Sequence, residues 1–113
     1  MNQTPIVTAR EVGDVSVLSI EGDVTAFAEG PIDRAYEGVV TDRTKILLSF
    51  RDGDHINSAG IAILIDLISR ARQRERTIRI SHPDAHFHKI FKMVGLTSYA
   101  SVHANEEDGL KGF

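Results

Sequence analysis

The sequence predicts an α/β domain with a mixed β-sheet of about five strands and about four helices. Two observations lead to this fold class. Short strand-like stretches follow one another along the chain, and stretches with helical spacing of apolar residues lie between most of them. The chain has 113 residues, which is enough for one domain with a modest core and too short for two. We therefore expect a single domain over residues 1–113.

The first two elements have the pattern of a β-hairpin. Residues 6–10 and 15–20 are both strand-like, and the second stretch alternates apolar residues with serines. The pair Gly13-Asp14 lies between them and suits a tight turn, because glycine adopts positive φ angles at low cost. The chain is therefore expected to begin with two antiparallel strands.

A helix and a buried strand are predicted next. From Phe27 onward, apolar residues recur at near-helical spacing. We expect this helix to begin near Pro31, because proline is tolerated in the first turn of a helix. Residues 45–50 form a short, nearly continuous apolar run bounded by charge, which is typical of a strand covered on both faces.

The second helix is expected to run from the Asn57-Ser58 pair to about Arg74. The apolar residues that predict its face toward the sheet are Ile61, Leu64, Ile65 and Ile68. At about 100° per residue, Ile63 and Leu67 fall on the far side of the helix. The residues beside them are Ala59, Asp66 and Arg70. The two apolar side chains need a cover, which is either a neighbouring helix of the same domain or a binding partner.

The last third of the chain continues the alternation. Residues 77–81 alternate as a strand, and the helical stripe after them consists of Phe87, Ile90, Phe91 and Val94. Gly95 is expected to end this helix in the left-handed conformation. Residues 99–103 suit a last short strand, and Asn105 is expected to cap a short acidic helix. Helices between successive strands imply a largely parallel sheet, where functional groups gather at the carboxyl ends of the strands.

Composition and charge exclude several classes of function. The formal net charge is −3, which argues against a nucleic-acid partner. The absence of cysteine excludes disulfides and thiolate zinc sites and fits a reducing cytoplasm. The first residues lack the pattern of a signal peptide, and no apolar run approaches the roughly 18 residues of a membrane span. We therefore expect a cytoplasmic protein with no direct membrane insertion.

The segment HINSAGIAIL, residues 55–64, places two small polar residues directly before the second helix. Asn57 and Ser58 can each cap a helix, because their side-chain oxygens accept hydrogen bonds from the free N–H groups of the first turn. A serine hydrolase would need a G-x-S-x-G turn together with a base and an acid. Here the first glycine is missing and His55 lies only three residues away. A small serine hydrolase is therefore the weakest functional hypothesis.

Residues that bind metals or phosphates do not form a recognisable motif. His82 and His86 have i, i+4 spacing, but Pro83 between them indicates that the helix starts after His82. The segment Asp52-Gly53-Asp54 lacks the remaining ligands of a calcium loop. The glycines lack the Gly-Lys-Ser/Thr sequence of a phosphate-binding loop. We therefore expect no metal, no cofactor and no catalytic residue.

Three segments together resemble the STAS domain family, whose best-known members are the bacterial anti-sigma factor antagonists. Residues 56–62, INSAGIA, are similar to the family's Asp-Ser-Ser/Thr-Gly-Leu-Gly segment. Residues 90–96, IFKMVGL, are similar to the end of a later helix in the family, and Gly22-Asp23 is similar to the turn after its second strand. The resemblance covers nearly the whole chain and implies the same α/β fold.

The resemblance also implies a non-enzymatic regulator of transcription that works by switching partners. In the family, the serine after the aspartate is phosphorylated by a partner that is both an anti-sigma factor and a protein serine kinase. That residue is Ser58 in this sequence. The unmodified antagonist binds the kinase, phosphorylation abolishes binding, and a PP2C-type phosphatase restores it. The other residues expected to contact the partner are Asp23, Asn57, Ala59, Ile63, Leu67 and Arg70.

Two residues depart from the pattern of the family. Asn57 replaces the aspartate before the serine, and Thr25 stands where many antagonists have an acid. Asparagine still caps a helix, but a kinase that requires the acid would not recognise Ser58. An alternative function is therefore a STAS scaffold or adaptor, in a stress-signalling or transporter-associated complex, in which Ser58 is never modified.

Overall fold

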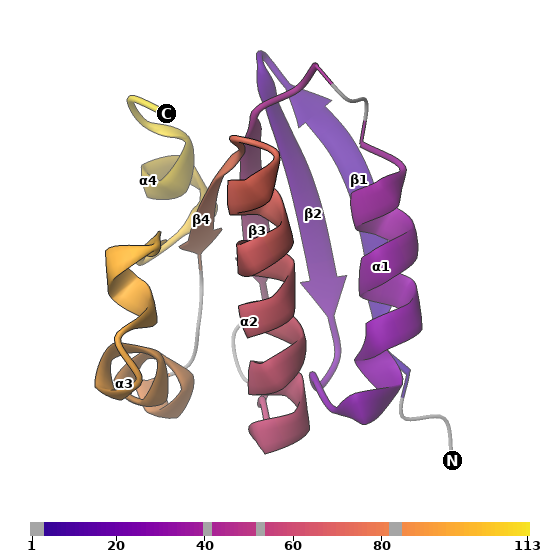
Figure 1. Ribbon diagram of the computed structural model, residues 1–113, viewed down its shortest axis with the longest axis vertical. Helices are drawn as coiled ribbons and strands as arrows, with labels where there is room; N and C mark the ends of the chain where they lie inside the picture. The colour runs from indigo at the N-terminus through magenta and orange to yellow at the C-terminus, as the bar shows by residue number, and fades with distance from the viewer. Residues whose placement is uncertain (1–3, 40–41, 52–53, 82–84) are drawn as a thin grey trace.

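The computed structural model describes residues 4–39, 42–51, 54–81 and 85–113. Its strands are β1 (Ile6–Val12), β2 (Val15–Glu21), β3 (Lys45–Phe50), β4 (Thr77–Ser81) and β5 (Ala100–His103). Its α-helices are α1 (Glu29–Glu37), α2 (Ser58–Gln73), α3 (Ala85–Met93) and α4 (Glu106–Leu110). Two short 3₁₀ turns, η1 (Ala26–Ala28) and η2 (Leu96–Ser98), precede α1 and β5 (Figure 1). The predicted fold class, a mixed sheet with helices between its strands, is confirmed.

The strands lie in the order β1-β2-β3-β4-β5 across one sheet. β1 and β2 are antiparallel, and the remaining neighbours are parallel. Gly13, with φ of 60°, lies in the turn of the hairpin, as the sequence predicts. Connections between parallel strands are right-handed, and each connection in this sheet contains one helix. We therefore expect α1, α2 and α3 to cover the same face of the sheet. Figure 1 shows α1 and α2 side by side in front of the strands.

The core has a large and a small part, one on each face of the sheet. In β3, Ile46 and Leu48 belong to the large cluster under α1, α2 and α3, whereas Leu47 belongs to a small cluster with Leu110 and Phe113. These three side chains have no exposed surface. This agrees with the prediction of a strand covered on both faces. It also explains why residues 45–50 have no alternation of polar residues.

The predicted orientation of α2 is partly wrong. Ile65, expected to face the sheet, is 42% exposed, whereas Ile63 and Leu67, expected on the far side, are 8% and 0% exposed. Ile63 and Leu67 are buried because η1 and α1 pack along one flank of α2, so that residues on this flank are covered as well as those that face the sheet. Leu67 is buried in the same core cluster as Ile32 and Tyr36 of α1, so this residue does not lie on an exposed surface.

The ends of the other helices follow local sequence signals. Pro31 lies in the first turn of α1, which begins two residues earlier than Pro31 itself. Gly95 adopts a left-handed conformation with φ of 80° after α3, and the Asn105 side chain accepts a hydrogen bond from the N–H of Asp108 in α4. These features confirm the predicted helix end and cap. Phe27, in contrast, is 62% exposed because it lies in η1 and not in α1.

Two of the sequence-based interpretations fall on residues outside the described ranges. They concern His82 with Pro83 and the Asp52-Gly53 part of the acidic loop. No helix in the described ranges has the length and apolar character needed to cross a membrane.

Candidate functional site

The start of α2 gives Asn57 and Ser58 different roles. Asn57 has an extended backbone, and its Oδ1 accepts a hydrogen bond of 2.9 Å from the N–H of Gly60. Asn57 is thus the N-cap, and its side chain satisfies one of the free donors of the first turn. Ser58 is the first residue of the helix, and it is exposed. Because Asn57 supplies the cap, the hydroxyl of Ser58 is available for chemistry.

The segment after β2 packs tightly against this helix end. The N–H of Val24 donates to the carbonyl of His55 at 2.8 Å, and the N–H of Asn57 donates to the carbonyl of Val24 at 3.1 Å. A Cβ atom on Gly60 would lie 2.2 Å from the carbonyl oxygen of Val24. Only glycine leaves room for this approach. The backbone at Val24 therefore fixes the position from which α2 begins.

Two aspartates bind the same two loops together. One carboxylate oxygen of Asp54 accepts a hydrogen bond of 2.7 Å from the N–H of Gly22. The guanidinium of Arg51 donates to both oxygens of Asp54 at 3.1 and 2.9 Å. Asp23 accepts a hydrogen bond of 2.9 Å from the N–H of His55. Each loop thus donates a backbone N–H to an aspartate of the other, which joins the two loops beside the α2 N-terminus.

The protonation of Asp54 reflects this arrangement. Burial raises the pKa of Asp54, but the hydrogen bonds from Arg51 and Gly22, together with the charge of Arg51, outweigh it and hold the pKa below its ordinary value. Asp54 is therefore ionised at neutral pH. Its ionised carboxylate accepts the hydrogen bonds from Gly22 and Arg51.

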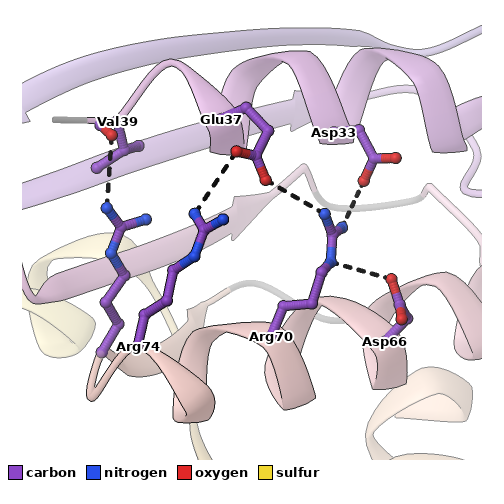
Figure 2. Close-up of polar contacts among 7 residues, drawn as sticks. Asp33, Glu37, Val39, Asp66, Arg70 and Arg74 are labelled. Atoms are coloured by element: carbon purple, nitrogen blue, oxygen red, sulfur yellow. Dashed lines mark hydrogen bonds and ion pairs between the residues drawn. The ribbon is translucent and has the colours of Figure 1, made fainter. Parts of the chain in front are cut away.

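Arg70 lies between α1 and α2 and is bound to acidic residues of both helices (Figure 2). It contacts Asp33 at 2.5 Å and Glu37 at 3.4 Å in α1, and it contacts Asp66 at 3.1 Å in its own helix. Arg74 shares Glu37 at 3.5 Å. The charge of Arg70 is thus neutralised within the domain, and its side chain joins the two helices.

A small groove of about 290 Å³ lies beside the first turns of α2. Ala59 and Ile63 contribute to its lining, and Glu29 and Asp66 bring acidic groups to it. Ile63 is only 8% exposed, so it forms part of the bottom of the groove and not a projecting contact. The groove begins one residue after Ser58, and its acidic lining would suit a basic group.

The predicted site residues separate into two groups. Asp23, Asn57, Ser58 and Ala59 belong to the β2 loop and the start of α2, which the hydrogen bonds above hold together. Leu67 lies nine residues after Ser58, roughly 14 Å along the helix axis, and it is buried. Arg70 lies a further three residues away from Ser58.

Sequence reasoning missed the roles of Val24, Gly60 and Asp54. Gly60 was part of the recognised INSAGIA segment, but its close contact with Val24 joins residues 36 positions apart, since 60 − 24 = 36. From the sequence, Asp54 is considered only as part of an incomplete calcium loop. Its bond to Gly22 spans 32 positions, and the signal available was the pairing of Gly22-Asp23 with an acidic loop after β3.

Comparison with known proteins identifies the fold family. A family model described as "Mlab, STAS domain" matches residues 7–102, which is most of the chain. The chain belongs to the STAS domain family. None of the curated proteins matches it. Among the described residues, no three His, Asp or Glu side chains are grouped so that they could hold a metal ion.

Solved structures with the same STAS fold include two proteins described as anti-sigma factor antagonists. The crystal structure of an anti-sigma factor antagonist from Mycobacterium paratuberculosis has a TM-score of 0.77 and 15% identity over 97% of this chain and 94% of that one. A proposed anti-sigma factor antagonist from Thermotoga maritima has a TM-score of 0.70 and 10% identity over 89% of this chain and 88% of that one. At these identities, the likeness establishes a shared fold.

Proposed function

We propose that this STAS domain is an anti-sigma factor antagonist, a non-enzymatic cytoplasmic regulator that is switched off by phosphorylation of Ser58. Its partner in this proposal is an anti-sigma factor that is also a protein serine kinase. The observation that carries the proposal is the exposed Ser58 at the first position of α2, beside an asparagine that already caps the helix. The fold shared with two proteins described as antagonists also supports it.

The proposed modification changes the surface without unfolding the domain. The kinase would transfer the γ-phosphoryl group of ATP to the Ser58 oxygen, with loss of the hydroxyl proton and release of ADP. The phosphate adds about −1.5 to −2 charges at a helix N-terminus, where the helix dipole favours negative charge. Because Ser58 is exposed, the phosphate stays in water in the free protein. In a complex it would have to be buried against the partner, which is costly.

The proposed contact surface is the end of the domain around Ser58. It comprises Asp23, Asn57 and Ala59, with Ile63 at the bottom of the neighbouring groove. The loops there are fixed by hydrogen bonds before any partner arrives, so binding orders few groups. A PP2C-type phosphatase would reach the exposed phosphoserine and restore binding by hydrolysis.

The test is incubation of the protein with candidate anti-sigma kinases and ATP, followed by mass spectrometry and a binding assay. We expect one phosphoryl group on Ser58, tight binding by Ser58→Ala, and binding by Ser58→Asp that is weaker by about 100-fold, since an unpaired charge in an interface costs several kcal/mol. Ser98→Asp, a similar change at an exposed serine in η2, should bind like the parent.

Three results would contradict this function. They are the absence of modification at Ser58, equal binding by the parent and Ser58→Asp, and loss of binding by Ser98→Asp to the same degree. Turnover of an activated ester that disappears in Ser58→Ala would point to the hydrolase alternative.

A second candidate function is a STAS adaptor in which Ser58 is not modified. The observation that favours it is Asn57, which is neutral where the family has an aspartate and whose side chain is used as a helix cap. Asn57→Asp should keep the cap and restore the acid. If the kinase requires that acid, Asn57→Asp raises the rate of phosphorylation at Ser58, whereas an equal rate in both proteins removes Asn57 as a reason for the adaptor function.

A further inference from the structure

A groove of about 500 Å³ lies on the other flank of α2, away from α1. One wall is formed by the last three turns of α2, with Ile65, Ile68 and Arg72, and the other by Leu96 and Tyr99 after α3. Ile68 and Leu96 are 3% and 8% exposed, so they form the bottom of the groove. Its interior is therefore apolar.

Large exposed apolar side chains are concentrated in the elements that form this groove, and two of them, Ile65 and Tyr99, line it. Among the described residues, six large hydrophobic side chains are exposed, and four of these lie in α2 or in the segment from the end of α3 to β5. The four are Ile65, Met93, Val94 and Tyr99. Single exposed apolar residues are ordinary, but a group of them around an apolar groove marks a site of interaction.

The charged side chain in the lining of the groove, Arg72, is positive. The guanidinium of Arg72 lies over the Tyr99 ring at 4.3 Å and has no carboxylate partner among the described residues. Residues 85–99 contain Lys89 and Lys92 and no acidic residue, although the whole chain has a formal net charge of −3. The basic character is thus local to this flank.

The opposite flank of α2 has a different balance of charge. Arg72 lies two residues after Arg70, which corresponds to about 200° around the helix. Arg70 points to α1, where Asp33 and Glu37 neutralise it (Figure 2). The two arginines therefore differ in function. Arg70 stabilises the domain, whereas Arg72 leaves a positive charge at the edge of an apolar groove.

We propose that this groove binds an amphipathic helix of a partner protein, with an apolar face toward the groove and acidic residues along its edges. The groove spans residues 65–73 of α2, which is roughly 12 Å along the helix axis. This length accommodates about two turns of a bound helix, with apolar residues at positions i, i+4 and i+7. Arg72, in the wall of the groove, supplies the charge that selects acidic over basic helices.

This surface is separate from the proposed phosphorylation site. Ser58 lies at the N-terminus of α2, whereas Ile65 and Arg72 follow it by 7 and 14 residues, roughly 10 and 21 Å along the helix axis. Binding of a helix in the groove thus adds a second contact to the domain, beyond the switch at Ser58. It does not depend on that switch.

The test uses a display library of peptides about 14 residues long, with leucines fixed at helical spacing and the remaining positions varied among Glu, Gln and Lys. The peptides are selected on the intact protein. We expect the enriched peptides to be rich in Glu, and their affinity, measured by fluorescence polarisation, to fall about tenfold with Ile65→Ser. Arg72→Glu should lower the affinity for Glu-rich peptides to a similar extent and raise the affinity for peptides in which Lys replaces Glu.

The controls are matched substitutions away from the groove. Ile6→Ser removes another exposed isoleucine, in β1, and Arg34→Glu reverses an exposed arginine in α1. Neither should change peptide affinity. The proposal is overturned if no peptide is enriched, if enriched peptides are basic or neutral, or if the groove variants bind like the parent. Binding of the protein to vesicles containing phosphatidylglycerol, with no binding of peptides, would instead assign the groove to a membrane surface.

Discussion

At the start of α2, one residue caps the helix and a different residue exposes a hydroxyl group. Asn57 accepts the hydrogen bond of the cap, and Gly60 allows the carbonyl of Val24 to approach the helix. Ser58 lies between them and is exposed. The helix can therefore keep its cap when the serine is modified, because the cap does not use the serine hydroxyl.

Gly60→Ala should destabilise the protein by more than about 2 kcal/mol, because the new Cβ would lie 2.2 Å from the backbone oxygen of Val24. The matched control is Gly30→Ala in α1, where the nearest atom to the new Cβ is the end of the flexible Arg34 side chain at 3.1 Å. Arg34 can move aside, so this control should gain up to about 1 kcal/mol from helix propensity. Urea unfolding measures the free energy of unfolding of both variants. Equal changes in the two variants would show that the carbonyl of Val24 leaves room for a side chain at position 60.

At the scale of elements, hydrogen bonds and ion pairs join segments that lie far apart in the sequence. The loop after β2 is bound to the loop after β3 through Asp23 and Asp54. α1 is bound to α2 through Arg70. These contacts place the N-terminus of α2 and the acidic groove beside it without help from a partner. The candidate site is therefore a property of four elements and not of α2 alone.

Asp54→Asn tests the first of these connections. The pKa of Asp54 is below its ordinary value in the folded protein, so the ionised carboxylate contributes stability above the unfolded pKa of about 3.9 and loses that contribution as the pH falls through the folded pKa. We expect Asp54→Asn to be less stable than the parent at pH 7, and the difference to shrink below about pH 4. Urea unfolding as a function of pH measures it. A difference that is constant with pH would exclude a role for the charge.

At the scale of the whole molecule, α2 separates two flanks of opposite character. On the α1 side, arginines are paired with Asp33, Glu37 and Asp66, and acidic residues line the groove near Ser58. On the α3 side, Arg72 borders an apolar groove. A single helix thus carries the proposed phosphorylation site at its N-terminus and, on another flank, the groove proposed to bind a helical partner.

The two proposed surfaces should act independently. Ser58→Asp should bind selected peptides in the groove like the parent, and Ile65→Ser should be phosphorylated on Ser58 at the parental rate. Since both side chains are exposed, both variants should melt within about 4 °C of the parent. Peptide binding, kinase assays and thermal unfolding measure these outcomes. Loss of peptide binding in Ser58→Asp would place both sites on one interface.

The secondary-structure elements of this protein follow from short-range patterns in its amino-acid sequence. The order of strands and helices, the hairpin turn at Gly13, the left-handed Gly95 and the caps at Asn57 and Asn105 depend on interactions within a few residues. Backbone preferences and hydrogen bonds at such short range are visible in the amino-acid pattern. The position of Ser58 directly after a capping residue was also visible in this way.

Which surfaces of these elements remain exposed depends on how the elements pack against one another. Helical periodicity assigned Ile65 to the core and Leu67 to the surface, but Ile65 is exposed at the groove beside Tyr99, and Leu67 is buried in the main core cluster. Likewise, Arg70 is neutralised by α1 and Arg72 is not. The physical reason is that burial and charge pairing depend on neighbours brought together from more than 30 positions away, and no local pattern in the sequence records those neighbours.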